Sequence, residues 1–450
     1  MYSTEQQKQS NEGESKKSEE KPVAKKSDDL SKFLAETIRA TGPISLASYM
    51  RQCLTNPAGG YYTNKDPFGV SGDFTTSPEI SQMFGELVGV WILTQWLAQG
   101  CPPKFRIVEF GPGRGTLMDD LLRAGRSFKD FTSALQDIYM IESSPTLREM
   151  QRQRLCDDVF SPVDSGYKST TKWKTPIFWF DNAKEIPREK NVPTFIIAHE
   201  FFDALPIYQF ENTKDGWREL QVDYSIPKDD SLLPGQSKVM ASGANDKPKF
   251  HLTMNPSWTP SSKVVPQSHP RYTKLPEGAK VEICPDAWDI ANQVGSVVEH
   301  CGGAALIVDY GPSATIPVDS LRAIKNHKIV NPFETPGEAD LSTDVDFQAI
   351  KVAAQQKHKV DVYGPVMQGD WLHAMGIGAR ATQLAENQKS DDGKKRIEQA
   401  YSRLVEKGGG AMGKVYKAMC IVPRGVNIPV GFGGKVEGED VEQHQQPPQN

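Results

Sequence analysis

The chain has 450 residues, of which 38% are hydrophobic and 24% charged, with a formal net charge of −5. This length can form one large or two modest globular domains. The negative charge argues against nucleic-acid binding, and the most apolar run, residues 87–98, is too short to span a membrane. The six cysteines are scattered, without metal-binding spacing to one another or to histidine. We therefore expect reduced thiols of an intracellular protein and no metal site.

The two ends of the chain are polar. Residues 1–29 are rich in Lys, Glu, Ser and Gln, and residues 431–450 contain many Gln and Pro, so we expect both segments to be disordered. A mitochondrial presequence is rich in arginine and poor in acids. Here the acids Glu5, Glu12, Glu14, Glu19 and Glu20 all come before the first arginine, Arg39, so the start shows no recognisable targeting signal.

Two amphipathic helices are predicted near the start, over residues 30–41 and 44–54. A long loop, residues 56–78, then leads to a predicted helix over residues 79–99. Compact domains rarely keep a loop of this length without a function. Two interpretations stay open at this point: an irregular surface loop that ends in a helix cap, or a segment that covers a ligand.

The most informative stretch is a predicted strand, residues 105–110, followed by a glycine turn with Gly111, Gly113 and Gly115, and then by a helix. Glycines allow positive φ and a close approach of ligand to backbone, and the helix that follows presents free N–H groups. The spacing is G-x-G-x-G, whereas the dinucleotide fingerprint is G-x-G-x-x-G. With Glu109 two residues earlier, the pattern resembles the first motif of Rossmann-like S-adenosylmethionine (SAM) methyltransferases. The alternative is a glycine turn in an ordinary βα unit.

Polar residues also follow the next two predicted strands, residues 137–141 and 177–180. Glu142 occupies the position at which such folds bind ribose hydroxyls, although it could instead cap the following helix. Asp181 and Asn182 occupy the usual position of adenine contacts.

The fourth predicted strand, residues 194–198, leads directly into His199, Glu200 and Asp203. Open α/β sheets bind ligands at the carboxyl ends of their strands. We therefore predict a ligand or substrate role for these side chains. The alternative is that the acids cap the next helix and that His199 is a hydrogen-bonded core residue.

Later segments complete the predicted organisation. Residues 211–276 are rich in Pro, Ser, Lys and Asp and predict a β-rich insertion. The core is then expected to continue with a strand at 281–284, a helix at 288–301 and a fifth strand at 303–309. A loop followed by a helix is expected over 320–347. The last two strands are expected at 363–367 and 414–422, on either side of a helix at 370–375. The predicted regions are 1–29 (disordered), 30–100 (helices and cofactor-covering loop), 101–211 (first part of the core), 212–280 (insertion), 281–430 (rest of the core) and 431–450 (disordered).

Five segments in order resemble the MidA-like methyltransferases: residues 72–86, 108–120, 198–206, 307–311 and 336–347. The resemblance implies an α/β, Rossmann-like class I fold with a seven-stranded, mostly parallel sheet, N-terminal helices and SAM as cofactor. It further implies a type II protein arginine methyltransferase of the mitochondrial matrix that symmetrically dimethylates an arginine in an iron–sulfur subunit of respiratory complex I and assists complex I assembly. A homodimer stays open, and no nucleic-acid partner or transmembrane span is expected.

The resemblance also assigns residues. It places Gly72, Asp73, Thr76 and Pro78 in a loop that closes over the cofactor, Glu109, Gly111 and Gly113 at its methionine end, and Glu142 at its ribose. An arginine substrate is a cation and needs carboxylates that grip its guanidinium group. We predict Glu200 and Asp203 in that role, with His199 as a candidate proton acceptor. Two rival functions are methylation of a different acceptor, such as a small molecule or a carboxylate, and a non-catalytic assembly chaperone that keeps a SAM pocket.

Overall fold

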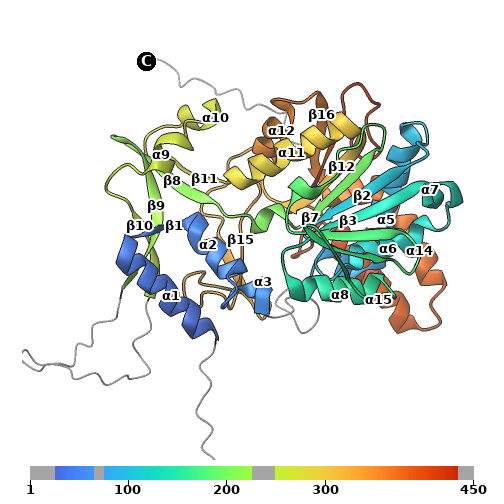
Figure 1. Cartoon of the computed structure of the whole chain (residues 1–450), viewed down its shortest axis with the longest axis horizontal. Helices are drawn as coiled ribbons and strands as arrows, with labels where there is room; N and C mark the ends of the chain where they lie inside the picture. Colours follow the sequence, from blue (N-terminus) through green and yellow to red (C-terminus); the bar gives the residue numbers. More distant parts are fainter. Residues whose placement is uncertain (1–25, 65–74, 226–248, 434–450) are drawn as a thin grey trace, which may run out of the picture.

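The computed structural model describes residues 26–64, 75–225 and 249–433 of the chain. Most of the two ends expected to be disordered, and the predicted cofactor-covering residues Gly72 and Asp73, lie outside this part. A large sheet with its helices and a smaller sheet with α1 and α2 lie side by side (Figure 1). No helix within the described ranges is long and apolar enough to cross a membrane.

The large sheet has nine strands in the order β16-β17-β12-β7-β2-β3-β6-β5-β4. The strands are β2 (Phe105–Phe110), β3 (Leu135–Ile141), β4 (Ser161–Val163), β5 (Gly166–Thr170), β6 (Pro176–Phe180), β7 (Thr194–His199), β12 (Gly303–Tyr310), β16 (Val360–Met367) and β17 (Tyr416–Pro423). The five central strands, β12, β7, β2, β3 and β6, are parallel, and the outer ones are antiparallel. The predicted α/β class with a mostly parallel sheet is confirmed. The expected number of seven strands was wrong, because the short hairpin β4–β5 extends the edge at β6.

The strand order places the glycine turn at the centre of the sheet. From β2 the chain proceeds to β3 and β6 on one side, and then crosses to β7 and β12 on the other. The order therefore reverses between β2 and β7. Open α/β sheets form a crevice at such a switch point, outside the carboxyl ends of the strands. Glu109 is in β2 and His199 ends β7, so both lie at this crevice.

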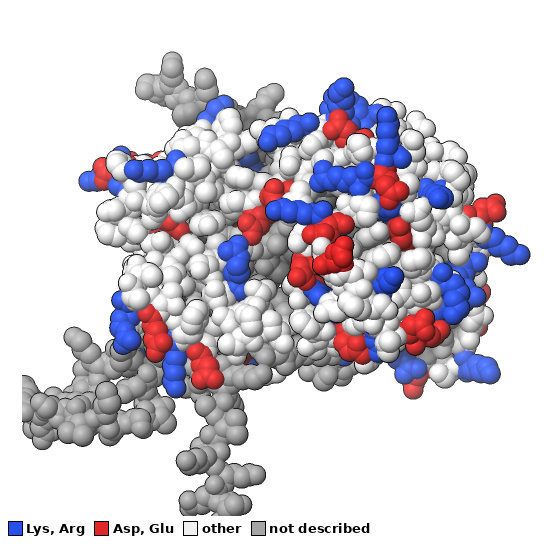
Figure 2. Space-filling view, in the orientation of Figure 1, with Lys and Arg blue, Asp and Glu red and all other residues white. Residues whose placement is uncertain are grey.

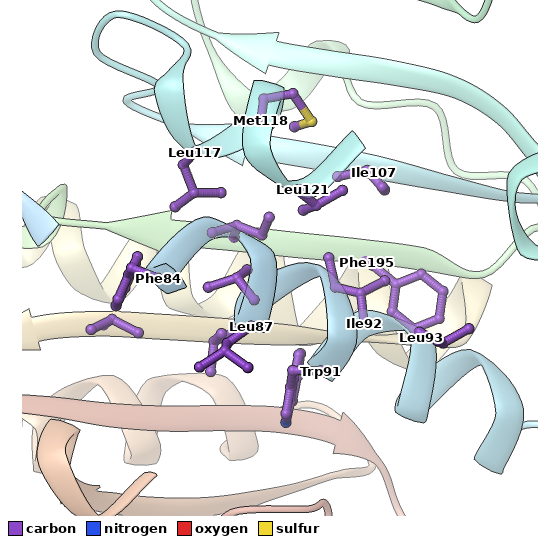
Figure 3. Close-up of a cluster of buried hydrophobic side chains, with 14 of the residues drawn as sticks. Phe84, Leu87, Trp91, Ile92, Leu93, Ile107, Leu117, Met118, Leu121 and Phe195 are labelled. Carbon is purple, nitrogen blue, oxygen red and sulfur yellow. The ribbon is translucent and has the colours of Figure 1, made fainter. Parts of the chain in front are cut away.

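Helices cover both faces of the large sheet. On one face α5 (Gln82–Ala98) and α6 (Thr116–Gly125) lie beside each other, and apolar side chains of both helices pack on the sheet in one cluster (Figure 3). Trp91 and Phe84 are fully buried there. Burying an apolar side chain contributes about 1.5–3 kcal/mol, so this packing fixes the helix that follows the glycine turn. The single helix expected over residues 79–99 is interrupted, because Ser81 is extended and caps α5 by accepting a hydrogen bond from the Met83 N–H.

The remaining helices of the large unit complete the two layers. The opposite face carries α11 (Pro285–Cys301) and α12 (Phe347–Gln355), which pack on each other. The others are α7 (Lys129–Ala134), α8 (Pro145–Leu155), α13 (Gln368–Ala374), α14 (Ile377–Glu386) and α15 (Asp391–Val405), with short helices η1 (Ala183–Glu185) and η2 (Phe202–Ala204). The helices α14 and α15 had no counterpart in the sequence-based prediction.

The smaller sheet contains the predicted insertion. Its strands are β1 (Ile44–Ser45), β8 (Tyr208–Thr213), β9 (Gly216–Ser225), β10 (Lys249–Met254) and β11 (Lys280–Ile283). It packs with α1 (Lys26–Thr41) and α2 (Leu46–Thr55), and the short helices α3 (Tyr61–Asn64), α9 (Pro260–Val264) and α10 (Pro270–Thr273) accompany it. Two expectations need correction. Residues 44 and 45 pair with β9 and are not helical, and β11 pairs with β8, so it belongs to this sheet and not to the core.

A third sheet forms within residues 320–347, where a loop followed by a helix was expected; the helix α12 begins only at Phe347. The sheet has the order β14-β13-β15, from β13 (Arg322–Lys325), β14 (Lys328–Val330) and β15 (Asp340–Ser342). Asn326 and His327 form the turn between the first two strands, both with positive φ. These three strands are too short to show a reliable alternation of apolar and polar residues in the sequence. Their pairing with one another stabilises them.

Arg106 provides a test of the core. This fully buried residue of β2 donates to Asp137 Oδ1 at 3.0 Å and to Glu189 Oε1 at 2.7 Å. Arg106→Met should lower the free energy of unfolding by about 3–5 kcal/mol, because buried Asp137 then keeps an unpaired charge. Urea denaturation measures this loss. The control Glu189→Gln changes a half-exposed partner and should cost less than about 1 kcal/mol. Equal losses in the two variants would contradict the prediction.

Candidate functional site

A cavity of about 530 Å³ lies at the carboxyl ends of β2, β7 and β12. Its walls are formed by the glycine turn, the segment before α4 (Ser77–Ile80), the three-stranded sheet and the start of β17. The lining residues with a predicted role are Thr76, Pro78, Glu109, Gly111, Gly113, His199, Glu200 and Asp203. The fold therefore gathers the candidate cofactor residues and the candidate acceptor residues in one space.

The glycine turn has the backbone geometry that its sequence predicts. Gly111, Gly113 and Gly115 have φ values of +59°, +54° and +75°, a region that other residues rarely adopt. A Cβ atom on Gly111 would lie 3.0 Å from Phe201 Cδ2, so close packing also requires glycine at this position. Gly115 precedes α6 directly and packs on Gln151, outside the residues that line the cavity.

Glu109 reaches the cavity from the end of β2. Its side chain is 2% exposed, and Oε2 has no hydrogen-bond partner among the described residues. Burial, and secondarily the nearby Glu142 carboxylate, raise the pKa of Glu109 to about 8. A buried acid with an unpaired oxygen at a cavity wall suits a cationic ligand group, because such a group would supply both a donor and a compensating charge.

Glu142 lies behind the turn and does not line the cavity. Its Oε1 accepts a hydrogen bond from the Ser144 N–H at 2.8 Å, and Oε2 accepts one from Gln151 Nε2 at 3.3 Å. The same Gln151 nitrogen donates to the Gly113 carbonyl at 2.7 Å. Mainly because of burial, the pKa of Glu142 is raised to about 7. Glu142 thus supports the N-terminus of α8, the alternative that the sequence left open, and its predicted ribose role stays a prediction.

Asp181 and Asn182 also lie outside the cavity lining. Asp181 is exposed and pairs with Arg148, while Asn182 Oδ1 accepts a hydrogen bond from the Lys184 N–H at 3.0 Å at the start of η1. Both side chains therefore have structural partners in this chain. The adenine contacts predicted for them remain untested.

The segment after β7 turns sharply to aim its side chains into the cavity. Glu200 has a φ of +48°, which is unfavourable for a residue with a Cβ atom and costs about 1–3 kcal/mol. Its carboxyl accepts hydrogen bonds from the Ser77 N–H and the Tyr416 hydroxyl, while Oε1 has no partner in the described ranges. Burial, and then the Asp203 carboxylate, raise the pKa of Glu200 well above its usual value. Strain of this kind is retained where it positions a functional group.

His199 is buried beside Glu200 and contacts Phe84, with ring centroids 4.8 Å apart and ring planes tilted by 57°. Its Nε2 lies 3.3 Å from Glu200 Oε1, but neither atom makes a hydrogen bond within the described part of the chain. Burial lowers the pKa of His199 to about 3. The ring is therefore neutral and weakly basic at pH 7, so the close pair is not an ion pair.

Asp203 is held by residues that the sequence analysis did not assign. Its Oδ2 accepts a hydrogen bond from the Tyr310 hydroxyl, while Oδ1 has no partner among the described residues. Fully buried Asp309 Oδ2 accepts from the Phe201 and Phe202 N–H groups at 3.2 and 3.0 Å and so fixes the turn. Burial raises the pKa of Asp203 despite the Tyr310 hydrogen bond.

Further polar residues line the cavity without having had a predicted role: Tyr62, Tyr310, Arg322, Asp340, Asp344 and Tyr416. Tyr62 donates to Asp340 Oδ1 at 2.7 Å, and Arg322 pairs with Asp344 at 2.8 Å while stacking over Tyr310 at 4.5 Å. Tyr310 ends the fifth predicted strand, and this position was the available signal for it. The others come from the short helix α3, the three-stranded sheet and the segment after it, and the start of β17, where no local pattern indicated a function.

The charges in the cavity are unbalanced. Its described lining contains the carboxyl groups of Glu79, Glu109, Glu200, Asp203, Asp340 and Asp344, but the guanidinium groups of only Arg114 and Arg322. By contrast, both signs are interspersed over the face of the molecule shown in Figure 2. The described lining of the cavity therefore carries more acidic than basic side chains, which indicates cationic ligands.

Comparisons with known proteins identify the family of the chain. Residues 87–366 match the family described as "Putative S-adenosyl-L-methionine-dependent methyltransferase". The chain belongs to this family. The methyltransferase is 37% identical to the mitochondrial protein arginine methyltransferase NDUFAF7 of Xenopus tropicalis over 86% of this chain and 84% of that protein. It is 36% identical to the mitochondrial NDUFAF7 homolog of Drosophila melanogaster over 88% and 85%. This kinship assigns the methyltransferase to the mitochondrion.

A solved structure shows the same fold. A protein from Burkholderia thailandensis bound to S-adenosyl-homocysteine superposes with a TM-score of 0.67 and 22% identity, over 91% of the methyltransferase and 96% of that protein. SAM is the cofactor of the family, and the cavity of the methyltransferase fits it. The positive-φ glycine turn permits a close backbone approach, and the unpaired Glu109 oxygen suits the ammonium group of SAM.

The affinity for SAM should depend on pH through Glu109. With a pKa of about 8, the free protein holds a proton that a bound ammonium group would displace. Because the complex then holds fewer protons, affinity should rise with pH up to about 8, by at most about tenfold per pH unit. Calorimetry in buffers of different ionisation enthalpy measures the released proton. Glu109→Gln should weaken this dependence, and the exposed-site control Glu149→Gln should keep it. A flat affinity between pH 6 and 8 would contradict the role.

Proposed function

We propose that the methyltransferase methylates an arginine side chain of a protein. The observation that carries this proposal is the pair Glu200 and Asp203 in the cavity. The side chain of Glu200 is 10% exposed and Asp203 is buried, and each carboxyl group keeps one buried oxygen without a hydrogen-bond partner among the described residues. A guanidinium group presents N–H donors in a planar fork that matches two carboxylates. The names of the relatives, as protein arginine methyltransferases, support the same substrate class.

The chain's own residues divide the chemistry as follows. When bound, SAM supplies an electrophilic methyl group. Glu200 Oε1 and Asp203 Oδ1 would orient the guanidinium, and the surrounding buried rings would exclude water from it. Methylation of a nitrogen releases one N–H proton. Glu200 is the better acceptor of that proton than His199, because the pKa of Glu200 is raised whereas that of His199 is lowered to about 3.

The finer function is part of the same proposal. We infer symmetric dimethylation of an arginine in an iron–sulfur subunit of respiratory complex I, in the mitochondrial matrix, in support of complex I assembly. The basis is the resemblance of five ordered segments to the MidA-like methyltransferases and the kinship with NDUFAF7. The candidate residues for the methionine end of the cofactor and those for the acceptor line the same cavity, as this reaction requires.

Label transfer tests the proposal. The protein is incubated with methyl-labelled SAM and a mitochondrial extract from cells that lack it, and labelled residues are mapped by mass spectrometry. We expect label on arginine, as symmetric dimethylarginine, in a complex I subunit. Label confined to small molecules would instead show a small-molecule methyltransferase, and binding of SAM without any transfer would favour the non-catalytic chaperone.

A further inference from the structure

The mouth of the cavity differs from its interior. Two large apolar side chains of the lining are exposed, Ile329 by 77% and Val415 by 56%. They come from different parts of the chain, β14 and the segment just before β17. Contact of aliphatic side chains with water is unfavourable. Single exposed aliphatic residues are common on protein surfaces, but two at the entrance of a site indicate a surface that contacts a ligand.

The hairpin β13–β14 extends this apolar surface inward. Ile324 and Ile329 are directly opposite in the antiparallel register, so their side chains lie on the same face. Both line the cavity, and Ile324 is half-buried whereas Ile329 is exposed. An apolar wall therefore runs from the outside of the cavity toward its acidic interior.

The backbone of the hairpin provides a second observation. β14 lies at the edge of the three-stranded sheet, with β13 as its one neighbour in the described part of the chain. An edge strand can pair with an added extended segment through main-chain hydrogen bonds, while pockets beside it select side chains. The edge strand β14, the apolar wall and the acidic interior of the cavity therefore all lie at the same entrance.

We propose that the acceptor arginine enters as part of an extended polypeptide segment whose apolar neighbouring side chains pack on Ile329 and Val415. The inference rests on the proposed arginine methylation and adds the acceptor's sequence preference. The cationic guanidinium matches the carboxyl groups inside, and the aliphatic neighbours match the rim. A free arginine or small guanidine would leave this rim unused.

The first test uses the rim variant Ile329→Ser/Val415→Ser and mitochondrial extract as acceptor, with label transfer from SAM as the readout. The apparent KM for the extract should rise about tenfold or more, because apolar contact area is lost, while kcat and SAM affinity change less than twofold. The control Ile428→Ser/Val159→Ser alters two equally exposed aliphatic residues outside the cavity and should behave as wild type.

The second test uses two short peptides as inhibitors of the same reaction, acetyl-Gly-Leu-Arg-Leu-Gly-amide and its counterpart with Ser in place of Leu. Wild-type enzyme should be inhibited about tenfold better by the leucine peptide, and the rim variant should lose this preference. Equal inhibition by the two peptides, no inhibition by either, or an unchanged KM in the rim variant would overturn the inference and leave arginine methylation standing. If wild-type enzyme labels no protein arginine, the proposed function fails and this inference fails with it.

Discussion

Replacing Glu200 with glutamine should lower kcat for protein methylation by about 10²–10³ and leave the affinity for SAM within twofold of wild type. Glu200 Oε1 is buried and unpaired in the cavity, so it is available to a guanidinium group. Glutamine keeps the size and one acceptor but removes the charge, and losing a charged hydrogen bond in a dry site costs several kcal/mol of transition-state stabilisation. Single-turnover label transfer and calorimetry with SAM measure the two quantities separately.

Glu219→Gln is a matched control for this experiment. Glu219 is also a buried glutamate with an unpaired oxygen, but it belongs to β9 of the smaller sheet and does not line the cavity. Its variant should methylate at the wild-type rate once it is folded. If Glu200→Gln also keeps the wild-type rate on the same arginine, Glu200 has no role in positioning. If SAM binding collapses instead, Glu200 belongs to the cofactor site and Asp203 becomes the first candidate for the guanidinium.

Gly113→Val should weaken SAM binding by at least about 10³-fold. Gly113 lines the cavity with φ at +54°, a conformation in which a β-branched residue is strongly disfavoured. The valine would either distort the turn or place its methyl groups in the space that the ligand needs. Calorimetry with SAM measures the affinity, and circular dichroism and thermal unfolding show whether the variant is folded.

Gly425→Val separates backbone strain from loss of the site. Gly425 also has a positive φ, of +85°, but a Cβ atom there would meet nothing within 4 Å, and the residue lies outside the cavity lining. This control should lose some stability, about 1 kcal/mol, and keep its SAM affinity. A folded Gly113→Val protein with wild-type affinity would remove the glycine turn from the cofactor site.

The sequence by itself determined the features that depend on local patterns. Buried parallel strands read as short apolar runs, and this identified β2, β3, β6, β7 and β12 to within about two residues. The positive-φ turn was evident because only glycine adopts that conformation readily. The carboxyl ends of parallel strands meet at one edge of a sheet. The sequence therefore placed Glu109, Glu200 and Asp203 at the same edge, and the structure has all three in the lining of one cavity.

Tertiary structure decided what depends on partners distant in the chain. Glu142 and Asp181 directly follow strands, as Glu200 does. A hydrogen bond from Gln151 to Glu142, and an ion pair between Arg148 and Asp181, nevertheless hold these two side chains outside the cavity lining. The strands β13, β14 and β15 are too short to be stable alone and exist through pairing. Through that pairing they bring Arg322 and Asp340 to the cavity, and they place Ile329 at its mouth. Local propensity carries no information on such contacts, because their free energy is gained only when segments distant in the chain pair and pack together.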